Sequence, residues 1–403
     1  MRRRVAITGI GLVTALGTTR EETWRRLVAG ECAVRPLTLF GSEGYRSRVA
    51  AEVATADVTA QLSRLERRRW SRSDQFGVLA AREAVVEAGL EGHYDSSRVG
   101  VILGAGTSDL LRNEEYHHTA LARGIQHARP SYAWNHFPSA PVDIIAGAFG
   151  FEGMRSCVAA ACASSTIAIG QAADAIRSGR LDAVLTGGTD ALARLTFSGF
   201  NALKLMDPEP CRPFDRGRAG MNIGEGAAIL VLEDLARARG RGAVIHAEVA
   251  GYSFACEAFH PTAPEPDGRP VTAIIAQALR DAQRNADEVD HVNAHGTATP
   301  QNDRAEARGF AAIFGARCTR LPVTSTKSMI GHCLGAAGGL EAAVLALTVA
   351  RGIIPPTINH EATDPDCPVD VVANTAREAR VSCGVSTSLG FGGNDAAVVI
   401  TRV

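Results

Sequence analysis

Lysine is almost absent from this sequence of 403 residues: only Lys204 and Lys327 are lysines among its 42 basic residues. A base-composition bias that replaces lysine by arginine explains this shortage wherever a surface charge is all that is needed. A lysine that persists in the segment TSTKSMIGHCLG, residues 324–335, indicates that a compact ammonium is required there and a planar guanidinium does not serve. The segment is therefore a candidate site, with chance survival on a solvated loop as the alternative.

Other shortages exclude several classes of protein. The net charge is only −1 and 21% of the residues are charged, so the composition favours neither nucleic acid nor an anionic membrane as a partner. No run approaches the roughly 20 apolar residues that span a bilayer. The N-terminal MRRRVAITGIGLVTALG lacks the sustained apolar core of a signal peptide. We therefore expect a soluble, cytoplasmic protein with no membrane span. Nine cysteines without a CxxC pair argue against a disulfide framework and a zinc site.

No linker divides the chain, but five apolar, glycine-punctuated segments of the first half recur in the same order in the second half. The pairs are 5–11 with 246–252, 99–107 with 290–297, 156–165 with 322–332, 182–190 with 382–393, and 227–233 with 396–403. The third segment of each series leads into a helix rich in small residues, 167–177 and 334–351. The repeat predicts two pseudo-symmetric α/β halves, 1–242 and 243–403, each a mixed sheet with helices on its faces.

Four chemically capable side chains fall near strand ends of this repeat. Cys162 lies at the start of the helix after the third strand, and His332 holds the equivalent place in the second half. His295 ends a strand, and Lys327 lies in the loop that leads to His332. In a body with pseudo-two-fold symmetry these strand ends converge near the centre. The sequence therefore predicts one common site.

Cys162, in AAACASST, is the candidate nucleophile of this site. The unpaired N–H groups and the dipole at a helix N-terminus favour a thiolate over a thiol, whereas the other eight cysteines are expected to be buried and inert. His295 and His332 can together hold the oxygen of an enolate or thioester with two imidazole N–H groups. Each histidine alone is as well explained as a hydrogen-bonded core residue. A metal site is less favoured, because the three residues come without a carboxylate in ligand spacing.

With these motifs the chain resembles the β-ketoacyl-acyl-carrier-protein synthases of the Cys-His-His type, which are elongating condensing enzymes of thiolase fold. The resemblance covers essentially the whole chain and implies a five-layered αβαβα fold. The stretch MNIGEGAA is similar to ketosynthases of polyene-type type II polyketide systems. The motifs that carry the resemblance are AAACASS, NAHGTATPQND, TSTKSMIGHCLGAAGG, CRPFDRGRAGMNIGEGA at 211–227 and GFGGND at 390–395.

The resemblance implies a decarboxylative Claisen condensation in fatty acid or type II polyketide chain elongation. Cys162 would take an acyl group from the phosphopantetheine of an acyl carrier protein. Malonyl-carrier protein would then lose CO2, and its carbanion would attack the acyl-enzyme. No cofactor bound to the chain itself is implied, because the carrier protein brings the phosphopantetheine. The partner subunit would be a second copy or a Cys-less paralogue of the chain-length-factor type.

The resemblance also implies a role for each site residue. His295 and His332 would stabilise the enolate, and the backbone N–H groups of Cys162 and Phe391 would form an oxyanion hole. Phe391 is similar to the family's gate between the two half-reactions.

Further roles carried over from the family concern binding and support. Thr297 and Thr299 would bind the pantetheine amides, and Lys327 would pair with Glu341 to organise the loop of His332. The basic run RLERRRWSR at 64–72 would meet the acidic carrier protein, with a solvated helix face as the alternative. The docking residues in this run would be Arg64, Arg67, Arg68 and Arg69.

Two segments depart from the family pattern, and three rival functions remain to be weighed. GFGGND replaces the commoner GFGGTN, and GAGTSDL at 104–110 replaces a glycine-rich stretch that lines the acyl pocket, so the acyl chain stays open. A non-catalytic chain-length factor would lack the thiol of Cys162. A thiolase would need a second thiol, for which Cys383 is the candidate, and a Cys-His hydrolase would not need paired histidines.

Overall fold

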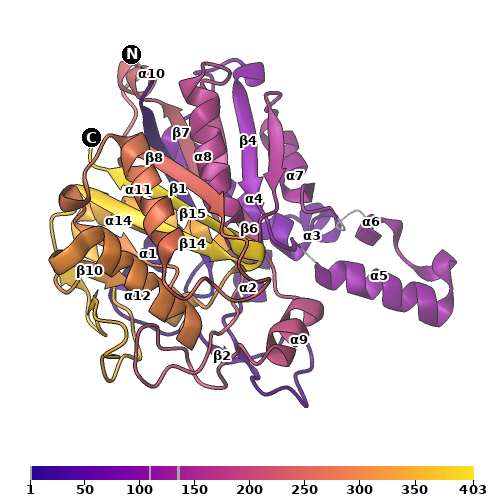
Figure 1. The fold of residues 1–403 in the computed structure, drawn as a ribbon. Coiled ribbons are helices and arrows are strands. Elements are labelled where there is room, and N and C mark those ends of the chain that lie inside the picture. The colour runs from indigo at the N-terminus through magenta and orange to yellow at the C-terminus, as the bar shows by residue number, and fades with distance from the viewer. Residues whose placement is uncertain (1, 109, 134–136) are drawn as a thin grey trace.

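The computed structural model describes residues 2–108, 110–133 and 137–403 (Figure 1). Its centre is an eleven-stranded sheet in the order β12-β10-β9-β14-β15-β8-β1-β7-β6-β4-β5. The strands of the first half are β1 (Val5–Thr14), β4 (Val99–Gly104), β5 (Arg155–Val158), β6 (Ala183–Asp190) and β7 (Gly226–Asp234). Those of the second half are β8 (Ala247–Cys256), β9 (His291–Asn293), β10 (Pro322–Thr324), β14 (Cys383–Gly390) and β15 (Asn394–Thr401).

The strand order confirms that the five segments of the first half recur in the second half, as predicted from the sequence. From one side the order is β5-β4-β6-β7-β1, and from the other, inside the edge strand β12, it is β10-β9-β14-β15-β8, so every predicted pair occupies mirrored positions. The two halves meet where β1 pairs antiparallel with β8, through Ala6 with Glu248 and Ile7 with Ala247. The boundary between the two predicted halves, 1–242 and 243–403, remains a prediction.

Helices complete five layers around the two halves of the sheet. In the middle, α8 (Ser164–Arg177) and α14 (Ala337–Arg351) pack on each other and on strands of both halves. On the first half, α4 (Arg72–Ala88) packs on β1, β7 and β6, and α7 (Ala140–Phe149) packs on β4 and β5. On the second half, α11 (Arg269–Ala282) covers β8 and β15, with α12 (Pro300–Phe314) beside it. The expected thiolase-like layering is therefore present.

The middle layer is built from small residues that allow close packing. A Cβ at Gly338 of α14 would lie 2.0 Å from Thr166 Oγ1 of α8, so only glycine permits this approach. The segment Leu334–Arg351 is apolar and long enough to cross a membrane, but 89% of it is buried inside the protein. It is therefore a core segment, which begins with a 3-10 turn at Leu334–Ala336 and continues as α14.

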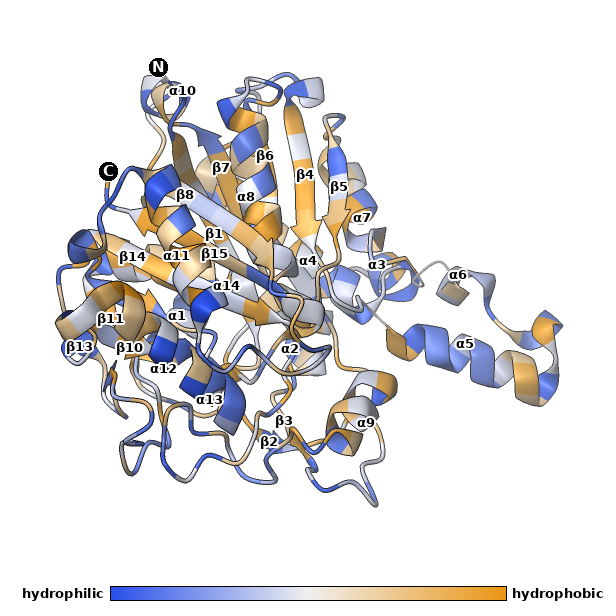
Figure 2. Ribbon diagram, in the orientation of Figure 1, coloured by the Kyte–Doolittle hydropathy of each residue, from blue (hydrophilic) through white to orange (hydrophobic). Residues whose placement is uncertain are grey.

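The remaining elements are short or peripheral. Figure 1 shows α5 and α6 extending away from the layered body, and Figure 2 shows that α5 is largely hydrophilic, whereas β4 and β14 are apolar. Asp109 of the GAGTSDL stretch lies outside the described residues. The other helices are α1 (Arg20–Val28), α2 (Thr55–Ala60), α3 (Arg64–Arg69), α5 (Leu110–Arg123), α6 (Pro130–Ala133), α9 (Arg194–Ala202), α10 (Leu235–Gly240) and α13 (Lys327–Ile330). The other strands are β2 (Arg35–Pro36), β3 (Val49–Ala50), β11 (Ile353–Ile354), β12 (Asp370–Val371) and β13 (Arg377–Glu378).

Candidate active site

Cys162 lies two residues before α8, at the helix start that the sequence predicted. The preceding residue, Ala161, has a φ of +47°. This left-handed conformation costs a non-glycine residue roughly 1–2 kcal/mol. Cys162 is 7% exposed and lines a pocket together with His295 and His332. The strained turn thus places a nearly buried sulfur between the two halves of the sheet.

His332 faces this sulfur directly. Its Nε2 atom lies 3.1 Å from Cys162 Sγ, and its Nδ1 atom accepts a hydrogen bond of 3.1 Å from the backbone N–H of Leu334. Burial and the charge of Lys327 lower the pKa of His332 well below its usual value, so the ring is neutral. A neutral imidazole carries one hydrogen, and because Nδ1 accepts, that hydrogen lies on Nε2 and points toward the sulfur.

The backbone of His332 is fixed by the conspicuous motif at 211–227. The N–H of His332 donates to the carbonyl of Asn222 at 2.7 Å, and its carbonyl accepts from the N–H of Gly224 at 3.0 Å. The MNIGEG part of the motif therefore acts as a short pairing strand for the second histidine. The sequence had shown the motif, but its contact with His332 becomes visible only in the fold.

His295 has the same hydrogen arrangement with a different donor. Lys327 Nζ lies 3.3 Å from His295 Nδ1, and an ammonium can only donate, so Nδ1 accepts and Nε2 carries the hydrogen. Burial, Lys327 and His332 lower the pKa of His295 well below its usual value. The centroids of the two imidazole rings lie 5.2 Å apart, and the ring planes make an angle of 85°. Both rings therefore present an Nε2–H group to the space beside Cys162.

Lys327 is 2% exposed and forms an ion pair with Glu341. Burial raises the pKa of Glu341 to about 7, although the ammonium acts in the opposite direction. The resemblance placed Lys327 at the loop of His332. In the structure its Nζ contacts His295, while its carbonyl accepts from Gly331 N–H at 2.9 Å and so shapes the His332 loop.

Two acidic residues to which the sequence analysis gave no role hold the loop of His295. Glu306 accepts from the backbone N–H groups of His295 at 2.8 Å and Gly296 at 2.6 Å. Asp303 accepts from the N–H of Ala298 at 3.1 Å. Burial raises the pKa of Glu306 to about 7. Their spacing of three residues on α12, directly after the histidine motif, was the available signal for one carboxylate-lined helix face.

The prediction that the helix start makes Cys162 a thiolate at rest is wrong. Burial raises the pKa of Cys162 to about 11. The charge of Lys327 and the backbone N–H groups of Phe391 and Cys162 lower it, but by less than burial raises it. The resting group is therefore a thiol. The same two N–H groups face the sulfur, which is where the resemblance placed the oxyanion hole.

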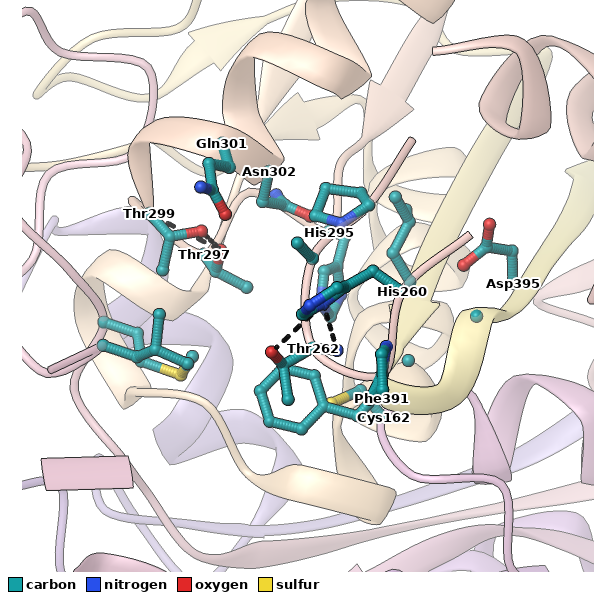
Figure 3. Close-up of a pocket in the computed structure, with 18 of the residues that line it drawn as sticks. Cys162, His260, Thr262, His295, Thr297, Thr299, Gln301, Asn302, Phe391 and Asp395 are labelled. Atoms are coloured by element: carbon teal, nitrogen blue, oxygen red, sulfur yellow. Dashed lines mark hydrogen bonds between the residues drawn. The ribbon is translucent and has the colours of Figure 1, made fainter. Parts of the chain in front are cut away.

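The active-site pocket has an empty volume of about 570 Å³, open mouth included, and Figure 3 shows its lining. The Oγ1 atoms of Thr297 and Thr299 lie 2.9 Å apart on one wall. The ring centroid of Phe391 lies 5.4 Å from the ring centroid of Phe200. Six predicted residues therefore share this pocket: Cys162, His295, His332, Thr297, Thr299 and Phe391.

The segment 257–264, which the sequence analysis did not single out, forms part of the pocket wall. It is bonded to the turn after Phe391, because Gly392 N–H donates to Pro261 at 2.8 Å and Glu257 N–H donates to Gly393 at 2.9 Å. Gly392 and Gly393 have φ values of +79° and +76°, which favour glycine. The side chains of His260 and Thr262 reach the pocket from this segment (Figure 3).

The predicted docking run divides into two parts. Arg72, at the start of α4, bonds to the buried carboxylate of Glu225 through its Nε at 2.8 Å and is therefore structural. The other four arginines belong to α3, whose start is capped by Ser63 and Glu66. The exposed residues that remain as docking candidates are Arg64, Arg67, Arg68 and Arg69.

The sulfur and ring nitrogens of Cys162, His295 and His332 lie within 4.8 Å of one another, close enough to be tested as metal ligands. A metal at either Nε2 would shift the ring hydrogen to Nδ1. There it would oppose a donor, the ammonium of Lys327 or the N–H of Leu334. The arrangement thus suits a negatively charged oxygen better than a cation.

The thiolase alternative loses its second thiol in the structure. Gly390, the last residue of β14, lies against Cys162, because a Cβ on Gly390 would be 3.3 Å from the Cys162 nitrogen. Cys383 is the first residue of the same eight-residue strand. At about 3.3 Å per residue, the strand places Cys383 roughly 23 Å from that end.

Comparison with known proteins agrees with this site. Residues 2–238 match the N-terminal domain of β-ketoacyl synthases, and residues 246–361 match their C-terminal domain. The tetracenomycin polyketide synthase ketoacyl synthase alpha subunit of Streptomyces glaucescens is 40% identical over 99% of this chain and 97% of that protein. The 3-oxoacyl-[acyl-carrier-protein] synthase 2 of Synechocystis is 36% identical over 100% of this chain and 98% of that protein.

Solved structures give the same result. The ishigamide ketosynthase/chain length factor superposes with a TM-score of 0.94 at 38% identity, and both chains are covered completely. A β-ketoacyl synthase from Burkholderia phymatum gives 0.91 at 32% identity, again with complete coverage of both chains. The chain therefore belongs to the β-ketoacyl synthase family, the acyltransferases that catalyse condensation in fatty acid or polyketide chain elongation.

Proposed function

We propose that Cys162 carries an acyl group that condenses with the malonyl group of an acyl carrier protein, giving 3-ketoacyl-carrier protein and CO2. One observation carries this assignment of roles. Both Nδ1 atoms accept hydrogen bonds, from Lys327 and from Leu334, so His295 and His332 both offer Nε2–H groups beside the sulfur. Two such donors match the oxygen on which negative charge develops when malonyl loses CO2.

In the first half-reaction Cys162 attacks the acyl thioester on the phosphopantetheine. The backbone N–H groups of Cys162 and Phe391, which face the sulfur, hold the oxygen of the tetrahedral intermediate. The bond from the acyl carbon to the pantetheine sulfur then breaks. The thiol hydrogen of Cys162 passes to the departing sulfur, so the exchange needs no external acid or base.

In the second half-reaction the malonyl carboxylate leaves as CO2, and the electrons of the broken bond form an enolate. The Nε2–H groups of His295 and His332 donate to its oxygen. The enolate carbon bonds to the acyl carbon, and the bond from the acyl carbon to the sulfur of Cys162 breaks. The released thiolate takes up one proton and restores the resting thiol.

Binding and assembly complete the proposal. Thr297 and Thr299 bind the pantetheine amides, and the carrier protein brings the phosphopantetheine, so the chain needs no cofactor of its own. A solved relative of 30% identity and TM-score 0.93 is described as a type II polyketide acyl-carrier protein in complex with its ketosynthase. Arg64, Arg67 and the neighbouring Arg68 and Arg69 offer a cationic docking surface for such an acidic carrier.

The chain works with a partner subunit in this proposal. The partner is a second copy or a Cys-less chain-length-factor-like paralogue, and the ishigamide relative is described as a ketosynthase/chain length factor. A cytoplasmic location agrees with the burial of the apolar segment Leu334–Arg351 in the core.

The deciding experiment supplies the protein with acyl- and malonyl-carrier protein and follows the products by mass spectrometry. We expect CO2 and a 3-ketoacyl product, and an acyl adduct on Cys162 when malonyl-carrier protein is left out. The Cys162→Ala variant is the matched control. An acyl adduct on another residue, or condensation by the alanine variant, would contradict the assignment.

A further inference from the structure

Asp190, the last residue of β6, holds segments of both halves of the chain with one carboxylate group. Its Oδ2 atom accepts from the backbone N–H groups of Gly106 and Gly335, each at 2.7 Å. Its Oδ1 atom accepts from the N–H groups of Thr107 at 2.9 Å and Ser108 at 2.6 Å. The first three donors in the sequence follow β4, whereas Gly335 belongs to the second half. Asp190 therefore joins the two halves beside the active site.

The partners of Asp190 require it to be an acceptor. Both of its oxygens face N–H groups, which can only donate, and the hydroxyl of Thr107 lies 3.5 Å from Oδ1. Burial raises the pKa of Asp190 to about 6, although the four N–H groups act in the opposite direction. The carboxyl group is therefore charged at neutral pH, and hydrogen bonds to a charged group contribute roughly 1.5–3 kcal/mol each.

The turn after His332 is strained at Leu334, the residue directly before Gly335. Leu334 has a φ of +51°, a left-handed conformation that costs a non-glycine residue roughly 1–2 kcal/mol. Its N–H donates to His332 Nδ1 at 3.1 Å, and the next N–H, of Gly335, donates to Asp190. These two bonds hold the peptide planes on either side of the Leu334 Cα atom. Together they keep Leu334 in the conformation that points its N–H at His332.

The backbones around Asp190 lie too close together for the turn to be held in another way. A Cβ on Gly335 would lie 2.1 Å from the nitrogen of Gly106, and a Cβ on Gly106 would lie 3.1 Å from Asp190 Oδ2. The loop of the first half and the turn of the second half are thus clamped on one carboxylate oxygen. Asp190 is 0% exposed, so it acts through this backbone and not on a substrate.

We propose that Asp190 is a positioning residue for decarboxylation: by holding the N–H of Gly335 it keeps the N–H of Leu334 on His332 Nδ1, and so keeps the ring hydrogen of His332 on Nε2. The inference rests on the proposed function, because that function assigns the Nε2–H group of His332 to the enolate oxygen. It adds a residue of the first half to the groups that prepare a histidine of the second half.

Loss of the carboxylate has a definite consequence for His332. The N–H of Gly335 would lose its acceptor, and Leu334 would relax toward negative φ. Its N–H would then turn away from His332 Nδ1, so the ring hydrogen could occupy either nitrogen. A ring that carries its hydrogen on Nδ1 presents a lone pair at Nε2, which repels the enolate oxygen. The expected defect is therefore in decarboxylation.

The test introduces Asp190→Asn into the wild type and into His332→Ala. Asparagine has the size of aspartate, but its NH2 group faces one pair of N–H groups, and that pair loses its acceptor. In the wild type, CO2 release from malonyl-carrier protein should fall about tenfold, less than the 10² to 10³ that removal of a donor costs. In His332→Ala the same change should cost nothing further, because the ring that Asp190 positions is absent.

The position of the ring hydrogen is a direct readout that a merely structural role would not change. NMR of protein with isotope-labelled histidine reports it, and the signals of His332 are identified by their loss in His332→Ala. We expect the hydrogen on Nε2 in the wild type and on both nitrogens in Asp190→Asn. The matched control is Asp290→Asn, because Asp290 also holds a loop, through the N–H groups of Ser382 at 2.7 Å and Cys383 at 3.1 Å, at the far end of β14. It should change neither the ring hydrogen nor CO2 release.

An unchanged ring hydrogen in Asp190→Asn would overturn the inference. An equal loss of CO2 release in both backgrounds would also overturn it, because Asp190 would then act through the loop 106–108. If Asp190→Asn does not fold, Asp190→Glu takes its place, since it keeps the charge but moves the oxygens by one methylene. Wild-type CO2 release by that folded variant would leave Asp190 a role in the fold alone and refute the inference. If the wild type itself releases no CO2, the proposed function fails, whereas equal release by the wild type and Asp190→Asn removes only the role of Asp190.

Discussion

The Nζ atom of Lys327 lies 3.3 Å from the Nδ1 atom of His295 and donates to it. This contact fixes the hydrogen of His295 on Nε2, the atom that faces the reaction. The same ammonium pairs with Glu341, so its position is set from two sides. This explains why a lysine persists here in a sequence that has only one other: a compact donor is required inside a buried cluster.

Lys327→Arg should fail nearly as badly as Lys327→Ala. A planar guanidinium needs more room than the close packing around Lys327 and Glu341, each only 2% exposed, offers without displacing His295. We expect malonyl decarboxylation to fall by about a hundredfold in both variants, the cost of disturbing one preorganised donor. The measurement is CO2 release from malonyl-carrier protein, with thermal unfolding recorded to verify the fold.

Lys204→Arg is the matched control for this prediction, because Lys204 is the other lysine and is exposed. It should release CO2 at the rate of the wild type. A fully active Lys327→Arg variant would show that any cation serves at position 327, and the persistence of this lysine would then be accidental.

Cys162→Ala should abolish acyl labelling and condensation while malonyl decarboxylation continues, because the imidazole pair of His295 and His332 remains. Cys383→Ala, at the far end of β14, should keep labelling and condensation. The readout is the mass of the acyl-enzyme together with CO2 release. Loss of condensation in the Cys383 variant would restore the thiolase interpretation, and labelling of Cys162→Ala would remove the nucleophile assignment.

The two histidines should differ in their effect on the first half-reaction. His295→Ala should lose decarboxylation by about 10² to 10³ and keep most of the acylation rate, since its donor acts on the enolate. His332→Ala should slow both steps, because its Nε2–H, 3.1 Å from Cys162 Sγ, also donates to the sulfur as negative charge develops on it. Single-turnover acylation and CO2 release separate the two steps. Equal loss of acylation in both variants would contradict the separate roles.

The fold could be predicted from the sequence where local pattern decides it. Seven of the ten repeated segments contain glycine, and the segments recur in one order, so the order of the pairs followed from the chain alone. The junction of β1 with β8 rests on two residue pairs and leaves no such pattern. The projecting helix α5 is mainly polar, and the sequence analysis made no prediction for it (Figure 2).

The site could be predicted only as far as its motifs extend. Cys162, His295 and His332 were found because each stands at the end of a strand or the start of a helix. The partner of Arg72 is Glu225, 153 residues away, and nothing near Arg72 in the chain announces it. The thiolate prediction failed for a related reason: burial raises the pKa of Cys162, and burial depends on segments brought together from both halves.

The docking prediction concerns the exposed arginines of α3. Reversing Arg68 and Arg69 to glutamate should raise KM for acyl-carrier protein, because charge complementarity with an acidic carrier speeds encounter and sets orientation. Salt screens such charges over roughly 8 Å at physiological ionic strength, so the increase should be largest at low salt. Acylation by a small pantetheine thioester, which needs no docking, should be unchanged.

The control makes the same change of charge elsewhere: Arg239→Glu with Arg320→Glu, two arginines that are also exposed. Both double variants alter the net charge equally, so a difference in KM between them reports the position of the charges on α3 rather than their number. The measurement is KM for both substrates across a salt series on each variant. Equal increases for the carrier-bound and the small thioester would show that α3 supports the fold, because a docking surface cannot affect a substrate that does not dock.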